Sequence, residues 1–194
     1  GGVEWLRWAA ELQDRMDSLF WDAAEGGYFG SAAGDPTILV RMKESYDGAE
    51  PAAGSVAALN LLRLAALLGR GEWRLRAAQT IASFRRQLEV APQAMPQLLV
   101  AVDFAREPVQ QLVLAGRPDD PAVRALAREV HRRLALPRVM LWAGEEPGQD
   151  WLLQQRPELA AMLPVGGRPA LYFCREATCL PPITELADVA RLLA

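Results

Sequence analysis

Histidine and cysteine are scarce in this sequence, which has one histidine and two cysteines among 194 residues. A structural zinc site needs about four such ligands, so we expect no metal and no bound cofactor. His131 stands beside Arg132 and Arg133 in a predicted helix, and we interpret it as an exposed residue. No Ser-His-Asp or Cys-His catalytic set is predicted.

The two cysteines, Cys174 and Cys179, flank a predicted tight turn. They could face each other across a hairpin, close enough for a disulfide. Their spacing is not the C-x-x-C redox spacing, and a cytoplasmic setting favours two free thiols.

The sequence also lacks an excess of charge of one sign and an uninterrupted apolar run. The net charge is −3, which leaves no electrostatic footprint for nucleic acid or for a membrane surface. The longest apolar stretch contains Asn60 and Arg63, and the N-terminus has no signal-peptide pattern, so a cytoplasmic protein is expected. Because the chain opens with Gly1 and Gly2 and has no initiating Met, we favour a piece of something longer.

Apolar residues recur with helical spacing over the first part of the chain. From Val3 to Trp21 the stripe includes Trp5, Trp8 and Leu12, which we predict to be core residues. A second helix is predicted from Ala52 to Leu68 and is apolar nearly all round, as is typical of a buried helix.

The polar residues of this second helix leave two readings open. Ser55, Asn60 and Arg63 fall on one side of the helical wheel, where they either line a cavity or act as core polar groups bonded by neighbours. Asp47 and Glu50 precede the helix, where the N-terminal N–H groups and the dipole favour an acidic complement.

The segment 22–50 is a long loop rich in glycine, and such loops are uncommon unless they bind something. It ends with Lys43, Glu44, Tyr46, Asp47 and Glu50. Glycoside hydrolysis uses two carboxylates about 5–10 Å apart, which makes Asp47 and Glu50 candidate catalytic residues. The alternative is a solvated, salt-bridged loop.

Further helices are predicted from Glu72 to Val90 and from Pro96 to Arg106. The pattern changes at Pro108. The later elements are strands at Val109–Ala115, Arg138–Ala143 and Pro169–Cys174, and helices at Ala122–Leu136, Asp150–Met162 (interrupted by Pro157) and from Thr184, as cap, to Leu193. Asp120 and Pro121 are expected to start the first of these helices, and the first two strands to be parallel.

The predicted fold class is therefore α+β. Residues 1–107 form helical hairpins, and residues 108–194 form a small α/β unit with a partly parallel sheet. Gly116 ends a strand and precedes a helix, but a lone glycine without G-x-G-x-x-G or a Walker lysine does not predict nucleotide binding.

Several motifs together resemble one protein family. They are Trp5 through Phe20-Trp21-Asp22, Gly26-Gly27-Tyr28-Phe29, Arg41-Met42-Lys43-Glu44, Asp47-Gly48-Ala49-Glu50-Pro51, the run from Ser55 to Leu64, Val113-Leu114-Ala115-Gly116, and Cys174 with Cys179-Leu180-Pro181-Pro182-Ile183-Thr184. This set is similar to the C-terminal part of thioredoxin-domain-containing proteins of the spermatogenesis-associated and bacterial YyaL type.

The resemblance implies a thioredoxin-like domain followed by an (α/α) toroid similar to six-hairpin glycosidases and N-acylglucosamine 2-epimerases. This chain would be a partial toroid, holding the last hairpins, with the thioredoxin-like domain and the remaining hairpins as its partners. The epimerases use histidines in the toroid, and the helical half here has none, so the resemblance transfers the fold and not the mechanism. Gly54 also departs from the family, which tends to have Asn before the Ser-Val-Ala run.

Two functions remain from the sequence. We favour a non-catalytic module that supports the toroid and a thioredoxin-like domain. The alternative is a carbohydrate-processing or carbohydrate-binding domain whose ligand-binding residues are Lys43, Glu44, Tyr46, Asp47, Glu50, Asn60 and Arg63. An open polar cavity at the loop favours the carbohydrate function, and paired charges favour the module. We also expect the apolar faces of the first two helices to be covered by the α/β half or by another subunit.

Overall fold

The computed structural model describes residues 2–133, 137–144, 147–176 and 178–193. The chain divides into two compact units. Unit 1 comprises Gly1–Trp5, Ala66–Gly69 and Pro108–Ala194, and unit 2 comprises Leu6–Ala65 and Arg70–Glu107. The predicted α+β class is confirmed.

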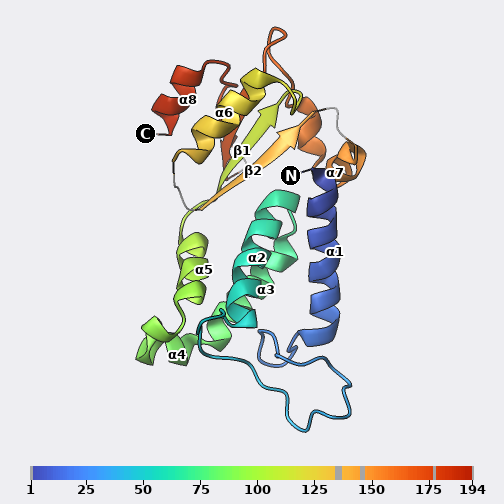
Figure 1. Cartoon of the computed structure of the whole chain (residues 1–194), viewed down its shortest axis with the longest axis vertical. Helices are drawn as coiled ribbons and strands as arrows, with labels where there is room; N and C mark the ends of the chain where they lie inside the picture. Colours follow the sequence, from blue (N-terminus) through green and yellow to red (C-terminus); the bar gives the residue numbers. More distant parts are fainter. Residues whose placement is uncertain (1, 134–136, 145–146, 177, 194) are drawn as a thin grey trace. The chain divides into compact units, whose positions relative to one another are not determined.

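Helices and the long loop make up unit 2 (Figure 1). The elements are α1 (Val3–Phe20), α2 (Ala53–Leu68), α3 (Gly71–Ser83), α4 (Arg85–Val90), the 3-10 helix η1 (Pro92–Ala94) and α5 (Pro96–Arg106), with the ends of α1 and α2 belonging to unit 1. Large buried side chains of its core include Leu61, Trp73, Met95, Leu98 and Phe104.

Two predictions about α1 and α2 have different outcomes. Most of α2 is buried, as predicted, including Leu59, Leu61 and Leu62. The α1 stripe is not core: Trp5 is 60% exposed and Trp8 53% exposed. The reason is that α1 packs through another side, where Ala10 and Gln13 are buried, and a helical period alone does not say which side meets the protein.

The helix predicted from Glu72 to Val90 is two helices. It breaks at Phe84, whose backbone is at φ −104° and ψ 11°. The buried Phe84 ring comes within 3.2 Å of where a Cβ on Gly54 would be. Gly54 therefore provides packing room for Phe84 beside the break.

A mixed sheet forms the centre of unit 1, with strand order β2-β1-β3-β4. The strands are β1 (Gln110–Ala115), β2 (Arg138–Ala143), β3 (Ala170–Arg175) and β4 (Thr178–Cys179). Strands β1 and β2 are parallel, as predicted, and β3 is antiparallel to β1.

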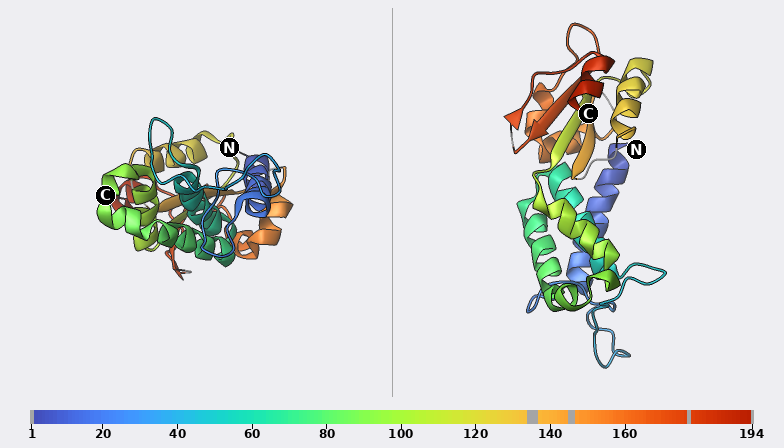
Figure 2. Two further views of the ribbon diagram at one scale, coloured as in Figure 1. Left: turned by 90° about the horizontal axis from the view of Figure 1, so that it is seen from below. Right: turned by 90° about the vertical axis from the view of Figure 1, so that its left-hand side faces the viewer.

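Helices cover both faces of this sheet (Figures 1 and 2). On one face, α6 (Pro121–His131) and α8 (Leu186–Leu192) pack on Leu112, Leu114 and Leu171. Gln111 alternates with Leu112 and accepts a hydrogen bond from Arg156. The helices on either side of Arg156, α7 (Gln149–Gln155) and η2 (Pro157–Ala161), therefore lie on the other face.

Helix starts in unit 1 were predicted with mixed success. Asp120 caps α6, accepting from the N–H of Ala122 at 2.8 Å, and Pro121 occupies the first turn, as predicted. Thr184 is not the cap of α8, because the chain enters that helix at Glu185 with no side-chain cap. The predicted end of α6 at residues 134–136 lies outside the described residues.

The cysteines form a disulfide, so the prediction of free thiols is wrong. Cys174 and Cys179 are direct partners across the β3–β4 pair, with their Cα atoms 4.0 Å apart. His131 is exposed, as predicted. Within the described residues, no group of three or more His, Cys, Asp or Glu side chains could hold a metal ion. None of the helices in that same part of the chain has both the length and the apolarity to span a membrane.

Candidate functional site

Asp47, a candidate catalytic residue, holds two helix N-termini together. Its Oδ1 accepts from the N–H of Ala52, just before α2, at 2.8 Å. Its Oδ2 accepts from the N–H groups of Gln97 at 2.8 Å and Leu98 at 3.3 Å, in the first turn of α5. These N–H groups have no partners within their helices, and a carboxylate suits their partial positive charge. The buried Asp47 carboxylate is therefore committed to the backbone.

Lys43, the predicted cationic ligand residue, is held inside the long loop. Its Nζ lies 2.7 Å from Asp22 Oδ2 and 3.7 Å from Glu25 Oε2, and it donates to the carbonyl of Gly26 at 2.7 Å. The hydrogen bond from Lys43 holds the pKa of Asp22 below its ordinary value. This part of the loop agrees with the alternative of a salt-bridged loop.

The remaining predicted site residues are exposed. They are Glu44, Tyr46 and Glu50 in the loop and Asn60 and Arg63 on α2. The interpretation of Asn60 and Arg63 as buried core polar groups is wrong, because both residues are exposed. Ser55 is fully buried instead, and its hydroxyl has no hydrogen-bond partner among the described residues.

A buried polar network in unit 2 was missed by the sequence analysis. The hydroxyl of Tyr28 donates to Asp17 Oδ1 at 2.5 Å and accepts from Gln13 Nε2 at 3.1 Å. Gln13 also donates to Asp17 at 2.8 Å, and Arg76 forms an ion pair with the second oxygen of Asp17. Burial raises the pKa of Tyr28, and the hydrogen bond to Asp17 adds to the rise. The network ties the loop to α1 and α3.

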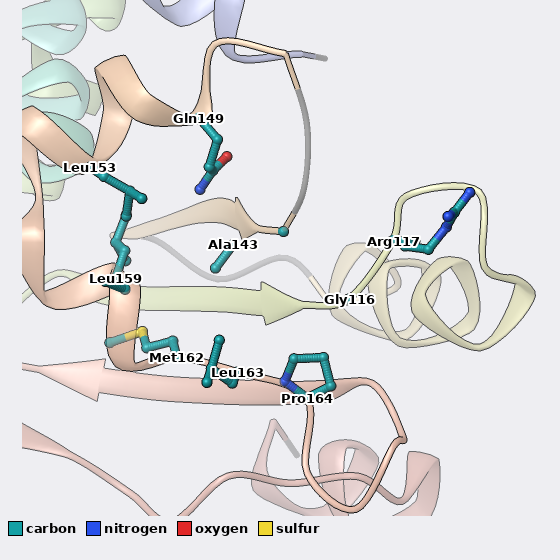
Figure 3. A pocket seen from close by; sticks show the side chains of 11 residues that line it. Gly116, Arg117, Ala143, Gln149, Leu153, Leu159, Met162, Leu163 and Pro164 are labelled. Carbon is teal, nitrogen blue, oxygen red and sulfur yellow. The ribbon is translucent and has the colours of Figure 1, made fainter.

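A cavity of about 410 Å³ lies in unit 1 where β1 and β2 end (Figure 3). We call it the strand-end pocket. Its lining residues are Gly116, Arg117, Ala143, Gly144, Gln149, Leu153, Leu159, Ala160, Met162, Leu163 and Pro164. Figure 3 shows side chains from α7, η2 and the following segment converging on the ends of the two strands. Crevices at the carboxyl ends of parallel strands are where α/β sheets commonly bind ligands.

The polar groups of the strand-end pocket are few. Gln149 Nε2 donates to the carbonyl of Trp142 over 3.4 Å, and its Oε1 is buried without a hydrogen-bond partner among the described residues. Arg117 is paired with Asp119 through two hydrogen bonds of 3.1 and 2.9 Å. That pairing holds the pKa of Asp119 below its ordinary value.

The glycine at the end of β1 has a packing role. Gly116 has φ 141°, and a Cβ there would come within 2.7 Å of Val123 Cγ2 in α6. A Cβ on Gly144 would come within 2.7 Å of the Gly116 carbonyl oxygen. Close approach of backbone and helix explains both glycines, so they give no support to phosphate binding.

A second hollow lies on unit 2, with a volume of about 510 Å³. It is lined by Ala78, Ile81, Ala82, Arg85, Leu88, Glu89, Val102, Ala105 and Arg106, which come from α3, α4 and α5. We call it the α3–α5 groove. Neither it nor the strand-end pocket is lined by a site residue predicted from the sequence.

Comparison with known proteins identifies close relatives. The chain is 36% identical over 190 residues to spermatogenesis-associated protein 20 of Rattus norvegicus, and 34% identical over the same length to that of Homo sapiens. Each match covers 97% of this chain and 24% of the relative. An uncharacterized protein of Caenorhabditis elegans is 32% identical over 194 residues, which are 99% of this chain and 26% of that protein.

No family model matches the chain. The matched part of spermatogenesis-associated protein 20 is its C-terminal region, which confirms the resemblance inferred from the sequence motifs. The chain spans about a quarter of the length of these relatives.

Proposed function

We propose that this chain acts as a non-catalytic C-terminal module of a longer protein, where it supports a helical toroid and a thioredoxin-like partner domain. The observation that carries this proposal is the bonding of Asp47. A catalytic carboxylate must reach a substrate, whereas Asp47 is buried and accepts three backbone hydrogen bonds. Lys43 is engaged in the same way with Asp22 and Glu25.

Exposed apolar surface in unit 2 supports the proposed partners. Trp8 and Leu12 of α1 are about half exposed, at 53% and 49%, and the α3–α5 groove presents Ile81, Leu88 and Val102. Exposed apolar side chains can form interaction sites, and further helices of a toroid would cover those of α1 and of the groove.

Asp47→Ala and Asp47→Asn test the proposal, with Glu50→Gln as the matched control on an exposed carboxylate of the same loop. We expect Asp47→Ala to lower the free energy of unfolding by about 2–4 kcal/mol, because three N–H groups lose a charged acceptor. Asp47→Asn should lower it less, since one amide oxygen remains. Glu50→Gln should leave it unchanged.

The same variants are titrated with glucose and N-acetylglucosamine by isothermal calorimetry. The module role predicts no binding heat that depends on Asp47 or Glu50. Stable folding of Asp47→Ala together with loss of saccharide binding would contradict the proposal.

The carbohydrate function remains the second candidate because five of its seven predicted residues are exposed. These are Glu44, Tyr46, Glu50, Asn60 and Arg63. Carboxylates and an aromatic ring are side chains that can bind a saccharide, and the Glu50→Gln arm of the calorimetry tests this candidate directly. A cytoplasmic location stays a prediction, and the Cys174–Cys179 disulfide is uncommon in that reducing compartment.

A further inference from the structure

The strand-end pocket has the size and position of a small-molecule site. Its volume of about 410 Å³ falls in the range of about 300–1,000 Å³ typical of such sites. It opens where β1 and β2, a parallel pair, end at Ala115 and Ala143. All of its lining residues belong to unit 1, so the cavity is complete within one compact unit.

The lining selects for an apolar ligand. Leu153, Leu159, Met162, Leu163 and Pro164 supply carbon surface from α7, η2 and the segment after η2, and Figure 3 shows them along one side of the cavity. Burial of carbon surface from water would supply most of the binding free energy.

The charges around the pocket disfavour an anion. Arg117, the cationic residue of the lining, is already paired with Asp119. The N-terminus of α6, a common type of anion site, is capped by the Asp120 carboxylate. The positive charge that would attract a phosphate or carboxylate is therefore already offset by the carboxylates of Asp119 and Asp120, which favours a neutral ligand.

Gln149 supplies the polar contact that remains open to a ligand. Its carboxamide has a single long hydrogen bond of 3.4 Å to Trp142, and its Oε1 has no partner among the described residues. A buried acceptor without a donor costs free energy, so the carboxamide gains by turning toward an incoming donor. An amide-like group offers a donor for Oε1 and an acceptor for Nε2 side by side, in the geometry that a carboxamide matches.

We propose that the strand-end pocket binds a neutral, mainly apolar small molecule that carries one amide-like donor and acceptor pair, which Gln149 recognises. This site is separate from the long loop and does not depend on the module role. It involves no chemical step, only binding.

Two probes of nearly the same shape test the proposal on the whole chain. Carbostyril is a flat bicyclic lactam with N–H and C=O adjacent, and N-methylcarbostyril lacks the donor. Each is titrated into isotope-labelled protein, and the dissociation constant is taken from backbone amide NMR shifts. We expect carbostyril to bind about fivefold more tightly, the effect of one net hydrogen bond, with the largest shifts at Gly116, Gly144 and Gln149.

Three variants provide the controls. Gln149→Met keeps the side-chain volume and should remove the preference for carbostyril over its methyl derivative. Ala160→Trp places a ring in the pocket from an exposed position of η2 and should weaken both probes at least about tenfold, since it takes the space that they need. Ala161→Trp is the matched control, because Ala161 is also exposed in η2 and does not line the pocket.

The outcomes distinguish the role of Gln149 from the existence of the binding site. Loss of the preference in Gln149→Met, with binding blocked by Ala160→Trp alone, supports the proposal. Equal affinity for the two probes in the wild-type chain overturns the role of Gln149. Absence of binding by either probe, or binding that Ala160→Trp leaves intact, overturns the site itself.

Discussion

The long loop of unit 2 and the strand-end pocket of unit 1 differ in their number of charged groups and in how far their polar groups are hydrogen-bonded. The loop is rich in charged groups, and two of them, the partly buried Lys43 and the buried Asp47, are bonded to other parts of the unit. The pocket is poor in charged groups, and the carbonyl oxygen of its Gln149 has no partner in the part of the chain that the structure describes. Polar residue types alone therefore do not locate a binding site, because the state of their hydrogen bonds decides what they can still contact.

Arg156 of unit 1 provides the largest expected effect in this comparison. Like Asp47, it makes several hydrogen bonds to other parts of its unit. It donates to the carbonyls of Ala66 and Leu67 at 3.0 Å, to Gln111 Oε1 at 2.9 Å, and to Glu158. Arg156→Met leaves these part-buried acceptors without the buried guanidinium that donates to them, and we expect a loss of about 3–5 kcal/mol of unfolding free energy in urea titrations, the sum of several hydrogen bonds.

Arg128→Met is the control for this largest effect, because Arg128 is exposed on α6. It should change the stability by less than about 0.5 kcal/mol. If Arg156→Met is as stable as its control, complete bonding does not identify structural residues and the comparison fails.

The disulfide lies in neither the long loop nor the strand-end pocket. Its removal should have an intermediate effect on the free energy of unfolding. Cys174→Ala with Cys179→Ala opens a hairpin loop of a few residues, and by loop-closure entropy we expect a loss of about 2 kcal/mol. Mass spectrometry with iodoacetamide, before and after reduction, checks the premise. Alkylation of both cysteines in the unreduced native chain would show that the bond is absent.

The hydroxyl of Tyr28 is expected to stabilise unit 2 through its polar network. Tyr28→Phe removes a hydroxyl that donates to Asp17 and accepts from Gln13, which should cost about 1–1.5 kcal/mol near neutral pH. Because burial and Asp17 raise the pKa of Tyr28 in the folded state, the neutral phenol is favoured by folding. Its contribution is present below the ordinary pKa of about 10 and is lost as the pH rises above it.

Urea titrations across this alkaline range measure the effect. The wild-type chain should lose more stability than Tyr28→Phe as the pH rises above about 10. Parallel pH curves for the two proteins would mean that Tyr28 is not held in its neutral form.

The smallest effect is expected in the strand-end pocket. Gln149→Met removes a carboxamide that makes one long hydrogen bond and whose oxygen has no partner among residues 2–133, 137–144, 147–176 and 178–193, so stability should stay within about 0.5 kcal/mol of the wild type or rise slightly. Thermal unfolding of the two proteins gives the comparison. A loss as large as that expected for Tyr28→Phe would show that Gln149 is structural.

Local features of the fold could be predicted from the sequence because their causes are local. Helical spacing located α1, α2 and α5 to within a residue or two, and Asp120 with Pro121 located the start of α6. The break at Phe84 could not be predicted, because it accompanies packing against Gly54, thirty residues earlier. The exposed side of α1 was misjudged for a related reason: the spacing of Trp5, Trp8 and Leu12 does not say what covers them.

The candidate sites depended more on distant contacts. Asp47 was recognised as a helix-start residue. Its hydrogen-bond donors Gln97 and Leu98 are about fifty residues further along the sequence, so no local pattern predicted these bonds. The strand-end pocket is lined by ordinary apolar residues from separate segments, and nothing about Leu153 or Met162 alone marks a cavity. Only the position of Gly116 at the end of a strand gave a hint.

Amide hydrogen exchange at Ala52, Gln97 and Leu98 tests most directly whether Asp47 is a structural clamp. In the wild-type chain these three N–H groups donate to the Asp47 carboxylate, so their exchange should be slow, and Asp47→Ala should speed it selectively relative to amides in the middle of α2. Exchange at these three positions that is the same in both proteins would contradict the structural role of Asp47 and return it to the list of residues free to act on a ligand.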